Sequence, residues 1–340
     1  MSYRYLGNKT KLTNWIVDTI SQSIPPNATV ADPMCGTAAV SNALALRGYS
    51  VIAADMLTFP TIHAKSRLLV KCEPNFELFK GYENILNELN SLEPKEGYFY
   101  KEFGEKGVPA NGRAPRLYFS AENSGKIDAI RGVIKKLHNE KEISDLEHAV
   151  LLQNLLLAVN KVANISGTYG YFRSKVSDNA KSLLKLEKLE FTSTPGQHSV
   201  LQGRVENLAS SIEADAIYLD PPYTKRQYAG NYHILETIAC EDEPVAQGDG
   251  GLRPWKGQAS AFCYKRSAGN ALQEILNSLK TQNVFLSYTD DGQISPTDIM
   301  EILRTFGEVK VYTHQYGRYQ SNNKAKGGII DETLYHLEMG

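Results

Sequence analysis

The chain has few cysteines, and they do not form a metal-binding pattern. It has four cysteines in 340 residues, with no Cys-x-x-Cys pair and no histidine nearby at the spacing of metal ligands. We therefore expect no zinc site and no other bound metal. A disulfide framework is not expected either, because such frameworks belong mainly to small secreted domains. The cysteines are Cys35, Cys72, Cys240 and Cys263.

The chain also lacks an excess of positive charge and a long apolar run. Its net charge is −1, so any surface that binds nucleic acid must be a local patch. The longest apolar stretch, residues 149–159, is interrupted by Gln153 and Asn154 and is too short to cross a bilayer. The first residues lack the apolar core of a signal peptide. We therefore expect a cytoplasmic protein with no membrane partner.

What the chain does contain is an alternation of strand and helix patterns. The composition, 42% hydrophobic and 22% charged, is that of a globular protein. Short β-branched runs separated by helical patterns predict an α/β fold, with a mainly parallel sheet covered by helices on both faces. The predicted strands are residues 28–31, 50–54, 216–219, 284–287, 309–313 and 333–337, and the predicted helices include residues 11–21, 40–47 and 272–280.

The alternation breaks in two places. Between residues 59 and 195 helical patterns dominate, at 76–92, 126–138 and 145–160, with loops such as 95–115 between them. We interpret residues 59–195 as an inserted, mostly helical lobe in a catalytic domain made of residues 1–58 and 196–340. The second break, residues 241–269, holds five glycines and two prolines, which predicts a long functional loop rather than core.

The strongest local motif is Asp220-Pro221-Pro222-Tyr223, directly after the apolar run 216–219. Two prolines cannot continue a central strand, so the chain must leave the sheet there. Ligands bind at the carboxyl ends of strands in open α/β sheets. A carboxylate and a proline carbonyl can accept the two protons of a planar amino group while the tyrosine stacks on the ring. A plain turn that ends a strand is the structural alternative.

Two further motifs fit a nucleoside-binding site. Residues 32–40, Asp-Pro-Met-Cys-Gly-Thr-Ala-Ala-Val, combine a strand end, a turn of small residues and a helix start, a layout that lets a ligand approach the backbone. Asp55 ends the next predicted strand and can accept ribose hydroxyls. Neither a Walker loop nor a complete Gly-x-Gly-x-x-Gly fingerprint is present. A tight turn and a strand-ending acid are the structural alternatives.

Together these residues resemble the Dam-like class of DNA N6-adenine methyltransferases. The resemblance covers both ends of the chain, about 200 residues, in the order cofactor elements, large insertion, Asp-Pro-Pro-Tyr tetrad. It implies a Rossmann-like sheet that binds S-adenosylmethionine, a helical lobe for target recognition, and a flipped adenine in double-stranded DNA. Residues 223–233 are similar to modification methylases, which suggests a restriction-modification system and a cognate restriction endonuclease as partner.

The resemblance also implies roles for individual residues. The tetrad is expected to be catalytic, with Asp220 also near the cofactor. Residues 200–203 look like the strand before the tetrad, and residues 318–323, followed by Glu332, look like the closing hairpin near the target base. The implied catalytic residues are Asp220, Pro221, Pro222 and Tyr223, and the implied cofactor residues are Tyr5, Gly7, Lys9, Asp32, Pro33, Gly36, Thr37, Asp55 and Asp220.

Several departures and alternatives accompany this prediction. Met34 stands where the family usually has an aromatic residue, Ala38 where it usually has a second glycine, and Arg204 where it often has an acid. Cytosine C5 methylation is set aside because Cys35 lies inside the cofactor loop. Cytosine N4 methylation, an RNA or glutamine acceptor, a non-catalytic DNA-binding protein on this scaffold, and a dehydrogenase remain open. Residues 169–173 and 226–228, which combine aromatic and basic side chains, are candidates for stacking and phosphate contacts, with aromatic packing as the structural alternative. The candidate recognition surfaces are residues 59–195 and 241–269.

Overall fold

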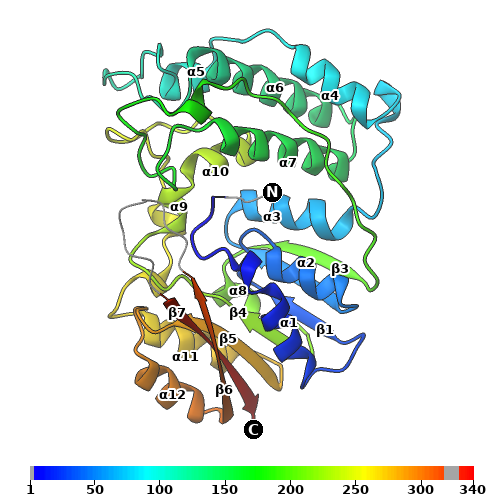
Figure 1. Ribbon diagram of the computed structural model, residues 1–340, viewed down its shortest axis with the longest axis vertical. Coiled ribbons are helices and arrows are strands. Elements are labelled where there is room, and N and C mark those ends of the chain that lie inside the picture. Colours follow the sequence, from blue (N-terminus) through cyan, green and yellow to red (C-terminus); the bar gives the residue numbers. More distant parts are fainter. Residues whose placement is uncertain (1–3, 318–328) are drawn as a thin grey trace. The chain divides into compact units, whose positions relative to one another are not determined.

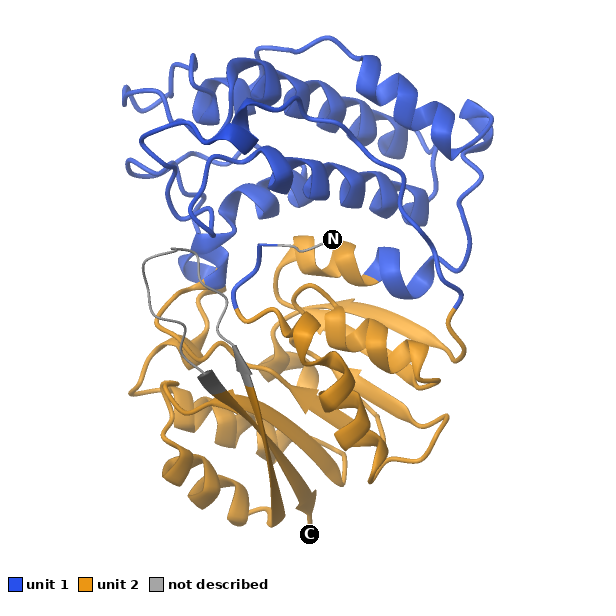
Figure 2. Cartoon of the chain, in the orientation of Figure 1, with its two compact units in different colours: residues 1–6, 65–193, 228–257 blue, residues 7–64, 194–227, 258–340 orange. Residues whose placement is uncertain are grey.

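The computed structural model describes residues 4–317 and 329–340 of the chain. The chain forms two compact units, which Figure 2 shows in different colours. Unit 1 contains residues 1–6, 65–193 and 228–257. Unit 2 contains residues 7–64, 194–227 and 258–340. None of the helices in the described ranges combines the length and apolar character needed to cross a lipid bilayer.

Unit 2 is built on a seven-stranded sheet (Figure 1). Its strands are β1 (Thr29–Asp32), β2 (Ser50–Asp55), β3 (His198–Gln202), β4 (Ala216–Leu219), β5 (Asn283–Thr289), β6 (Gly307–Gly317) and β7 (Ile329–Met339). Their order is β3-β2-β1-β4-β5-β7-β6, and the first five are parallel. Strand β7 is antiparallel to both β5 and β6. Five neighbouring parallel strands confirm the predicted mainly parallel α/β sheet, which is Rossmann-like in its alternation of strands and helices.

Helices cover both faces of this sheet. They are α1 (Thr13–Ser21), α2 (Ala39–Leu46), α3 (Thr58–Ala64), α8 (Val205–Leu208), α11 (Ala268–Ser278) and α12 (Pro296–Arg304). A hydrophobic core lies between the sheet and helices α8, α11 and α12, with Ile217 and Leu272 fully buried in it. Helix α2 packs against α1, β1 and β2. Because side chains alternate along a strand, Ile217 and Leu219 enter the first core and Tyr218 points to the opposite face.

Unit 1 is mostly helical. Its helices are α4 (Tyr82–Ser91), α5 (Tyr98–Phe103), α6 (Ala121–Asn139), α7 (Asp145–Val162), α9 (Tyr228–Asn231) and α10 (His233–Cys240). Helix α7 begins with a capping box between Ser144 and Glu147, in which each side chain bonds the other residue's backbone N–H. Helix α7 is apolar on most sides, and α6 and α10 pack against it. It is therefore the central helix of the unit.

The observed structure differs from the sequence prediction in several details. Residues 228–257 belong to unit 1, where α10 packs on α7, and residues 59–64 belong to unit 2, where α3 packs on β2 and β3. The helix predicted at 76–92 begins only at Tyr82, because Phe76 and Lys80 have positive φ angles of 42° and 58°. The prediction that residues 241–269 contain no core is wrong for Phe262, which is buried under the sheet.

Candidate active site

Three carboxylates predicted from the sequence lie at the same edge of the unit 2 sheet. Asp32 is the last residue of β1, Asp55 the last of β2, and Asp220 follows β4. Strand β1 lies between β2 and β4 and is parallel to both, so the carboxyl ends of all three strands meet there. The strand connections reverse direction at this point of the sheet, which is where open α/β sheets bind ligands.

Asp32 is a buried carboxylate with one oxygen engaged. Its Oδ2 accepts a hydrogen bond of 2.6 Å from the hydroxyl of Ser41. Its Oδ1 is buried and has no hydrogen-bond partner among the described residues. Burial, with the nearby charges of Asp220 and Asp55, raises the pKa of Asp32 to about 7. A cationic group reaching Oδ1 would satisfy this oxygen and favour the ionised form.

The loop after Asp32 has a tightly folded backbone. Gly36 and Ala38 both have left-handed φ angles, 50° and 55°. Asp55 supports the loop, since its Oδ2 accepts the backbone N–H of Gly36 at 3.1 Å and its Oδ1 accepts that of Leu57 at 2.9 Å. The left-handed conformation explains why glycine suits position 38, where an alanine costs roughly 1 kcal/mol. The neighbouring loop residues Pro33, Gly36 and Thr37 are buried.

The tetrad lies beside a buried cation, the side chain of Lys9. Lys9 Nζ is 3.1 Å from Oδ1 of Asp220 and 5.4 Å from the centroid of the Tyr223 ring. Tyr223 also packs edge-on against Tyr288, with 6.3 Å between the ring centroids. Between Asp220 and Tyr223 in the sequence, Pro221 is buried and Pro222 is half-buried. The tetrad therefore brings a carboxylate and an aromatic ring to the same buried cation.

Lys9 has a second carboxylate partner in Glu332 of β7. Its Nζ is 2.7 Å from Oε1 of Glu332, and Ser287 of β5 donates a 2.5 Å hydrogen bond to the same oxygen. Burial lowers the pKa of Lys9, but the charges of Asp220 and Glu332 outweigh burial and raise it well above its usual value. Burial raises the pKa of Asp220 to about 6; Lys9 opposes this rise, and Glu332 adds to it.

The amino-terminal candidates fall into different units. Gly7 and Lys9 belong to unit 2, where Gly7 has a left-handed φ of 67°. Tyr5 belongs to unit 1 and stacks on Tyr232, with 4.8 Å between the ring centroids. Tyr228 donates a hydrogen bond from its hydroxyl to the carbonyl of Leu6. The structure thus places Tyr5 in an aromatic cluster of unit 1, and its expected contact with the cofactor stays a prediction.

Sequence reasoning missed the hydroxyl groups that support the site. Ser41 bonds Asp32, and Ser287 bonds Glu332. The local signal for Ser287 is a hydroxyl residue directly after the apolar run 284–286. Arg204, which departs from the family pattern, donates from Nη2 to the carbonyl of Ala259 at 2.9 Å. Residues 318–323, expected to form the closing hairpin, lie outside the described residues.

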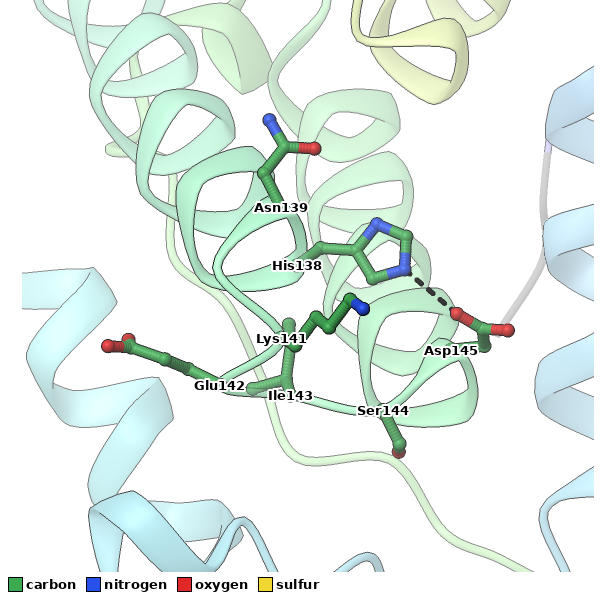
Figure 3. A pocket seen from close by; sticks show the side chains of 7 residues that line it. All are labelled: His138, Asn139, Lys141, Glu142, Ile143, Ser144 and Asp145. Carbon is green, nitrogen blue, oxygen red and sulfur yellow. Dashed lines mark hydrogen bonds and ion pairs between the residues drawn. The ribbon is translucent and has the colours of Figure 1, made fainter.

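A surface pocket lies at the turn between α6 and α7 of unit 1 (Figure 3). His138 and Asp145 are hydrogen-bonded there, with 2.9 Å between Nε2 and Oδ1. It is lined by His138, Asn139, Lys141, Glu142, Ile143, Ser144 and Asp145. None of these is a candidate site residue. In the described part of the chain no three His, Cys, Asp or Glu residues form a group that could hold a metal ion.

Comparison with known proteins gives relatives along nearly the whole chain. It is 32% identical to the type II methyltransferase M.FokI of Planomicrobium okeanokoites over 98% of this chain and 52% of that protein. It is 33% identical to the modification methylase LlaI of Lactococcus lactis subsp. lactis over 98% of this chain and 55% of that protein. The chain thus spans about half the length of these two relatives. It is 31% identical to the type II methyltransferase M.NlaIII of Neisseria lactamica over 98% of both.

The family comparison agrees with the geometry of the sheet edge. Residues 5–302 match the family described as D12 class N6 adenine-specific DNA methyltransferase. This range includes every candidate site residue named from the sequence, from Tyr5 to Tyr223. The methyl donor of this family is S-adenosylmethionine. The chain therefore belongs to the D12 class of N6 adenine-specific DNA methyltransferases.

Proposed function

We propose that this chain transfers a methyl group from S-adenosylmethionine to the N6 amino group of an adenine in duplex DNA, as the modification enzyme of a restriction-modification system. The observation that carries the proposal is the position of Asp220-Pro221-Pro222-Tyr223 at the sheet edge that also holds Asp32 and Asp55. A cognate endonuclease that cuts the unmethylated site is the partner this function implies. The substrate would place the enzyme with DNA in the cytoplasm of a bacterial, archaeal or phage-infected cell.

The residues of the sheet edge fit the cofactor. Oδ1 of Asp32 is a buried acceptor suited to an ammonium group, and the Asp55 carboxylate suits the ribose hydroxyls. The folded backbone at Gly36 leaves no side chain to obstruct a nucleoside. Pro33 and Thr37 complete the same loop. When bound, S-adenosylmethionine supplies an electrophilic methyl group on a positively charged sulfur.

The tetrad would hold the acceptor. The amino group of adenine is a poor nucleophile because its lone pair is delocalised into the ring. Asp220 and the Pro221 carbonyl would accept its two protons, which favours a nitrogen whose lone pair points away from the ring, while Tyr223 stacks on the base. Formation of the N–C bond would be matched by cleavage of the bond between the methyl group and sulfur, which leaves a neutral thioether. The amino proton, acidic at this stage, would pass to Asp220 or to water. Most of the acceleration comes from this alignment and from the fixed charge.

The target must leave the DNA stack to reach the tetrad. We propose that unit 1 supplies the surface that recognises the DNA, together with the loop of residues 241–257 that belongs to it. The exposed loop after α7 supports this proposal, since it carries Tyr171, Arg173 and Lys175 at the surface. Aromatic and basic side chains together are typical of nucleic-acid contacts.

The experiment that tests the function is transfer of labelled methyl from S-adenosylmethionine to unmethylated duplex DNA, followed by nucleoside analysis. Label in N6-methyladenine supports the proposal. Label in N4-methylcytosine would replace adenine by cytosine as the acceptor. Label that enters RNA or protein but not DNA would overturn the DNA assignment. No label, with the cofactor bound in equilibrium dialysis, would indicate a non-catalytic DNA-binding protein.

Methyl transfer should depend on pH through two carboxyl groups. Asp32 and Asp220 have raised pKa values of about 7 and about 6, so both gain protons as the pH falls through this window. A protonated Asp32 loses attraction for an ammonium group, and a protonated Asp220 loses acceptor capacity. We expect kcat/KM for S-adenosylmethionine to fall below about pH 7. Asp32→Asn should lower kcat/KM overall and leave one acid limb near pH 6; an unchanged profile in this variant contradicts the assignment.

Tyr171→Ala should weaken DNA binding. The Tyr171 ring is 55% exposed and stacks on Phe172 at 4.5 Å between centroids, and Phe172 packs edge-on against the buried Tyr118. This supported ring is a platform for a base. Loss of one such stacking contact should lower the affinity by about 5- to 100-fold. Fluorescence anisotropy of labelled duplex DNA measures the change, and Tyr171→Phe, which keeps the ring, is the matched control. Equal affinities of the Ala and Phe variants would exclude stacking by Tyr171.

A further inference from the structure

A buried ion cluster joins four distant parts of unit 2. Lys9 comes from the turn Lys9–Lys11 before α1, Asp220 follows β4, Glu332 lies on β7 and Ser287 on β5. The Lys9 side chain is 4% exposed and that of Glu332 0%, whereas Asp220 retains 17%. The cluster therefore has a buried end at Glu332 and an open end at Asp220. The open end is the carboxylate that the proposed function uses.

Stability alone does not explain why these charged groups are buried. Removing charged groups from water costs free energy that an ion pair does not always recover, and apolar residues of similar volume often do as well or better. Here the two carboxylates of Asp220 and Glu332 both contact the Lys9 ammonium, and Ser287 donates a hydrogen bond to Glu332. A function at the open end explains the cluster better than packing does.

A chain of polar contacts runs from Ser287 on β5 to Asp220 in the tetrad. Ser287 holds Oε1 of Glu332, Glu332 holds Nζ of Lys9 at 2.7 Å, and Lys9 bonds Oδ1 of Asp220 at 3.1 Å. Each hydrogen bond restricts the rotation of the next side chain. With Oδ1 engaged by Lys9, the second oxygen, Oδ2, is the acceptor assigned to the ligand proton. The orientation of the Asp220 carboxylate is thus fixed by Lys9, Glu332 and Ser287, which do not touch the substrate.

We propose that Glu332 and Lys9 are positioning residues for the amino-group acceptor, with Glu332 holding Lys9 so that Lys9 orients the Asp220 carboxylate. This inference rests on the proposed methyl transfer. It gives Lys9 a role toward the tetrad, in contrast to the cofactor contact that the family resemblance implies. It also gives a role to Glu332, which the sequence placed only near the closing hairpin.

The two positioning residues act on Asp220 in opposite electrostatic directions. The Lys9 ammonium lowers the pKa of Asp220, and the Glu332 carboxylate raises it. Among the described residues, the other titratable groups that interact with this cluster are Asp32 on β1, whose pKa Asp220 itself raises, and the tyrosines Tyr218 and Tyr223. The pKa values of Asp32 and Asp220, about 7 and about 6, lie close together. The pH–rate profiles are therefore also measured with Asp32→Asn, a reference variant in which Asp32 no longer titrates.

The test compares Lys9→Met and Glu332→Gln with the unaltered protein. Single-turnover methyl transfer to duplex DNA is followed with saturating S-adenosylmethionine between about pH 5 and pH 9. Lys9→Met should lower the maximal rate by about 10- to 100-fold and move the acid limb to higher pH. Glu332→Gln keeps the shape and hydrogen-bonding capacity of the side chain, and it should move the acid limb to lower pH. Calorimetric affinity for S-adenosylmethionine should stay within about threefold in both variants.

Three further results decide the inference. Lys9→Arg, which keeps the positive charge, should recover part of the rate, and Ser287→Ala should lower it less than Lys9→Met does. These two variants also keep the test informative if Lys9→Met does not fold, as judged by thermal melting. Acid limbs that do not move, or that move in the same direction in Lys9→Met and Glu332→Gln, overturn the inference.

The remaining outcomes separate this inference from the proposed function. Weaker S-adenosylmethionine binding with an unchanged saturated rate in Lys9→Met makes Lys9 a cofactor contact, and the positioning role fails while the methyl transfer stands. Absence of transfer by the unaltered protein overturns the proposed function instead. In that case ¹³C-carboxyl NMR of aspartate-labelled protein, assigned with Asp220→Asn, still tests the charge arrangement through opposite shifts of the Asp220 titration.

Discussion

Asp220→Ala should lower the rate of methyl transfer by about 10²- to 10³-fold or more, without weakening the binding of S-adenosylmethionine. The substitution removes the carboxylate proposed to accept the amino protons of adenine. It also removes a negative charge that raises the pKa of Asp32. Asp32, the proposed partner of the cofactor's ammonium group, therefore becomes more fully ionised in this variant. Lys9 keeps Glu332 as its partner, so no buried cation is left uncompensated. Single-turnover rates and calorimetric affinity together measure the effect.

The matched variant is Asp220→Asn. Asparagine has the same shape and keeps one acceptor oxygen, but it loses the charge and introduces a donor. We therefore expect its rate to lie between those of the unaltered protein and Asp220→Ala. A rate for Asp220→Ala within tenfold of the unaltered protein would falsify the catalytic assignment of the tetrad. Reduced cofactor affinity as the main defect would instead make Asp220 a cofactor residue.

Arg116→Met should destabilise unit 1 by about 3–5 kcal/mol. Arg116 is fully buried, and its Nη1 bonds both the carboxylate and the backbone carbonyl of Glu102. Its other donors reach the carbonyls of Gly248 and Asp249, at 3.2 and 3.0 Å. Methionine fills part of the volume but leaves the Glu102 charge buried without its cation. Denaturant unfolding, monitored within unit 1 by hydrogen exchange, measures the loss.

Arg113→Met is the control for this substitution. Arg113 pairs with Asp249, but both side chains are more than half exposed, so the loss should stay below about 1 kcal/mol. The double variant Arg116→Met with Glu102→Gln should recover part of the stability, because no charge then stays buried without a partner. Equal losses for Arg113→Met and Arg116→Met would contradict the buried-charge explanation. Since Arg116 holds the loop that contains Gly248, DNA affinity should fall with the stability of unit 1.

Local patterns along the chain predicted the strands and the residues at their ends. The runs before Asp32, Asp55 and Asp220 are apolar and short, which predicted a strand before each acid. The structure shows that these strands are parallel neighbours, so the three acids meet at one edge of the sheet. Helices α6 and α7 were also predicted, because their apolar residues recur with helical spacing. These features depend on residues that are near one another in the sequence.

Helix α5 shows why other elements could not be predicted. Residues 95–115 were expected to be a loop, yet Tyr98–Phe103 forms a helix. Its first turn is capped from a different helix, since the carboxylate of Asp128 accepts the backbone N–H groups of Phe99 and Tyr100 at 2.9 and 2.8 Å. A helix this short is not stable by its own propensity. The cap and the surrounding aromatic packing exist only after the chain has folded.

The sequence by itself determined which groups are the candidates for the chemistry: the tetrad, the loop after Asp32, and the acid at the end of β2. Only the tertiary structure decided which groups contact them. Lys9 and Glu332 are 323 positions apart, and no local pattern relates them. They meet because β7 pairs antiparallel with β5 and brings Glu332 opposite Thr289, close to Ser287. A buried ammonium needs carboxylate partners, and the partner is chosen by strand order, which short-range patterns do not encode.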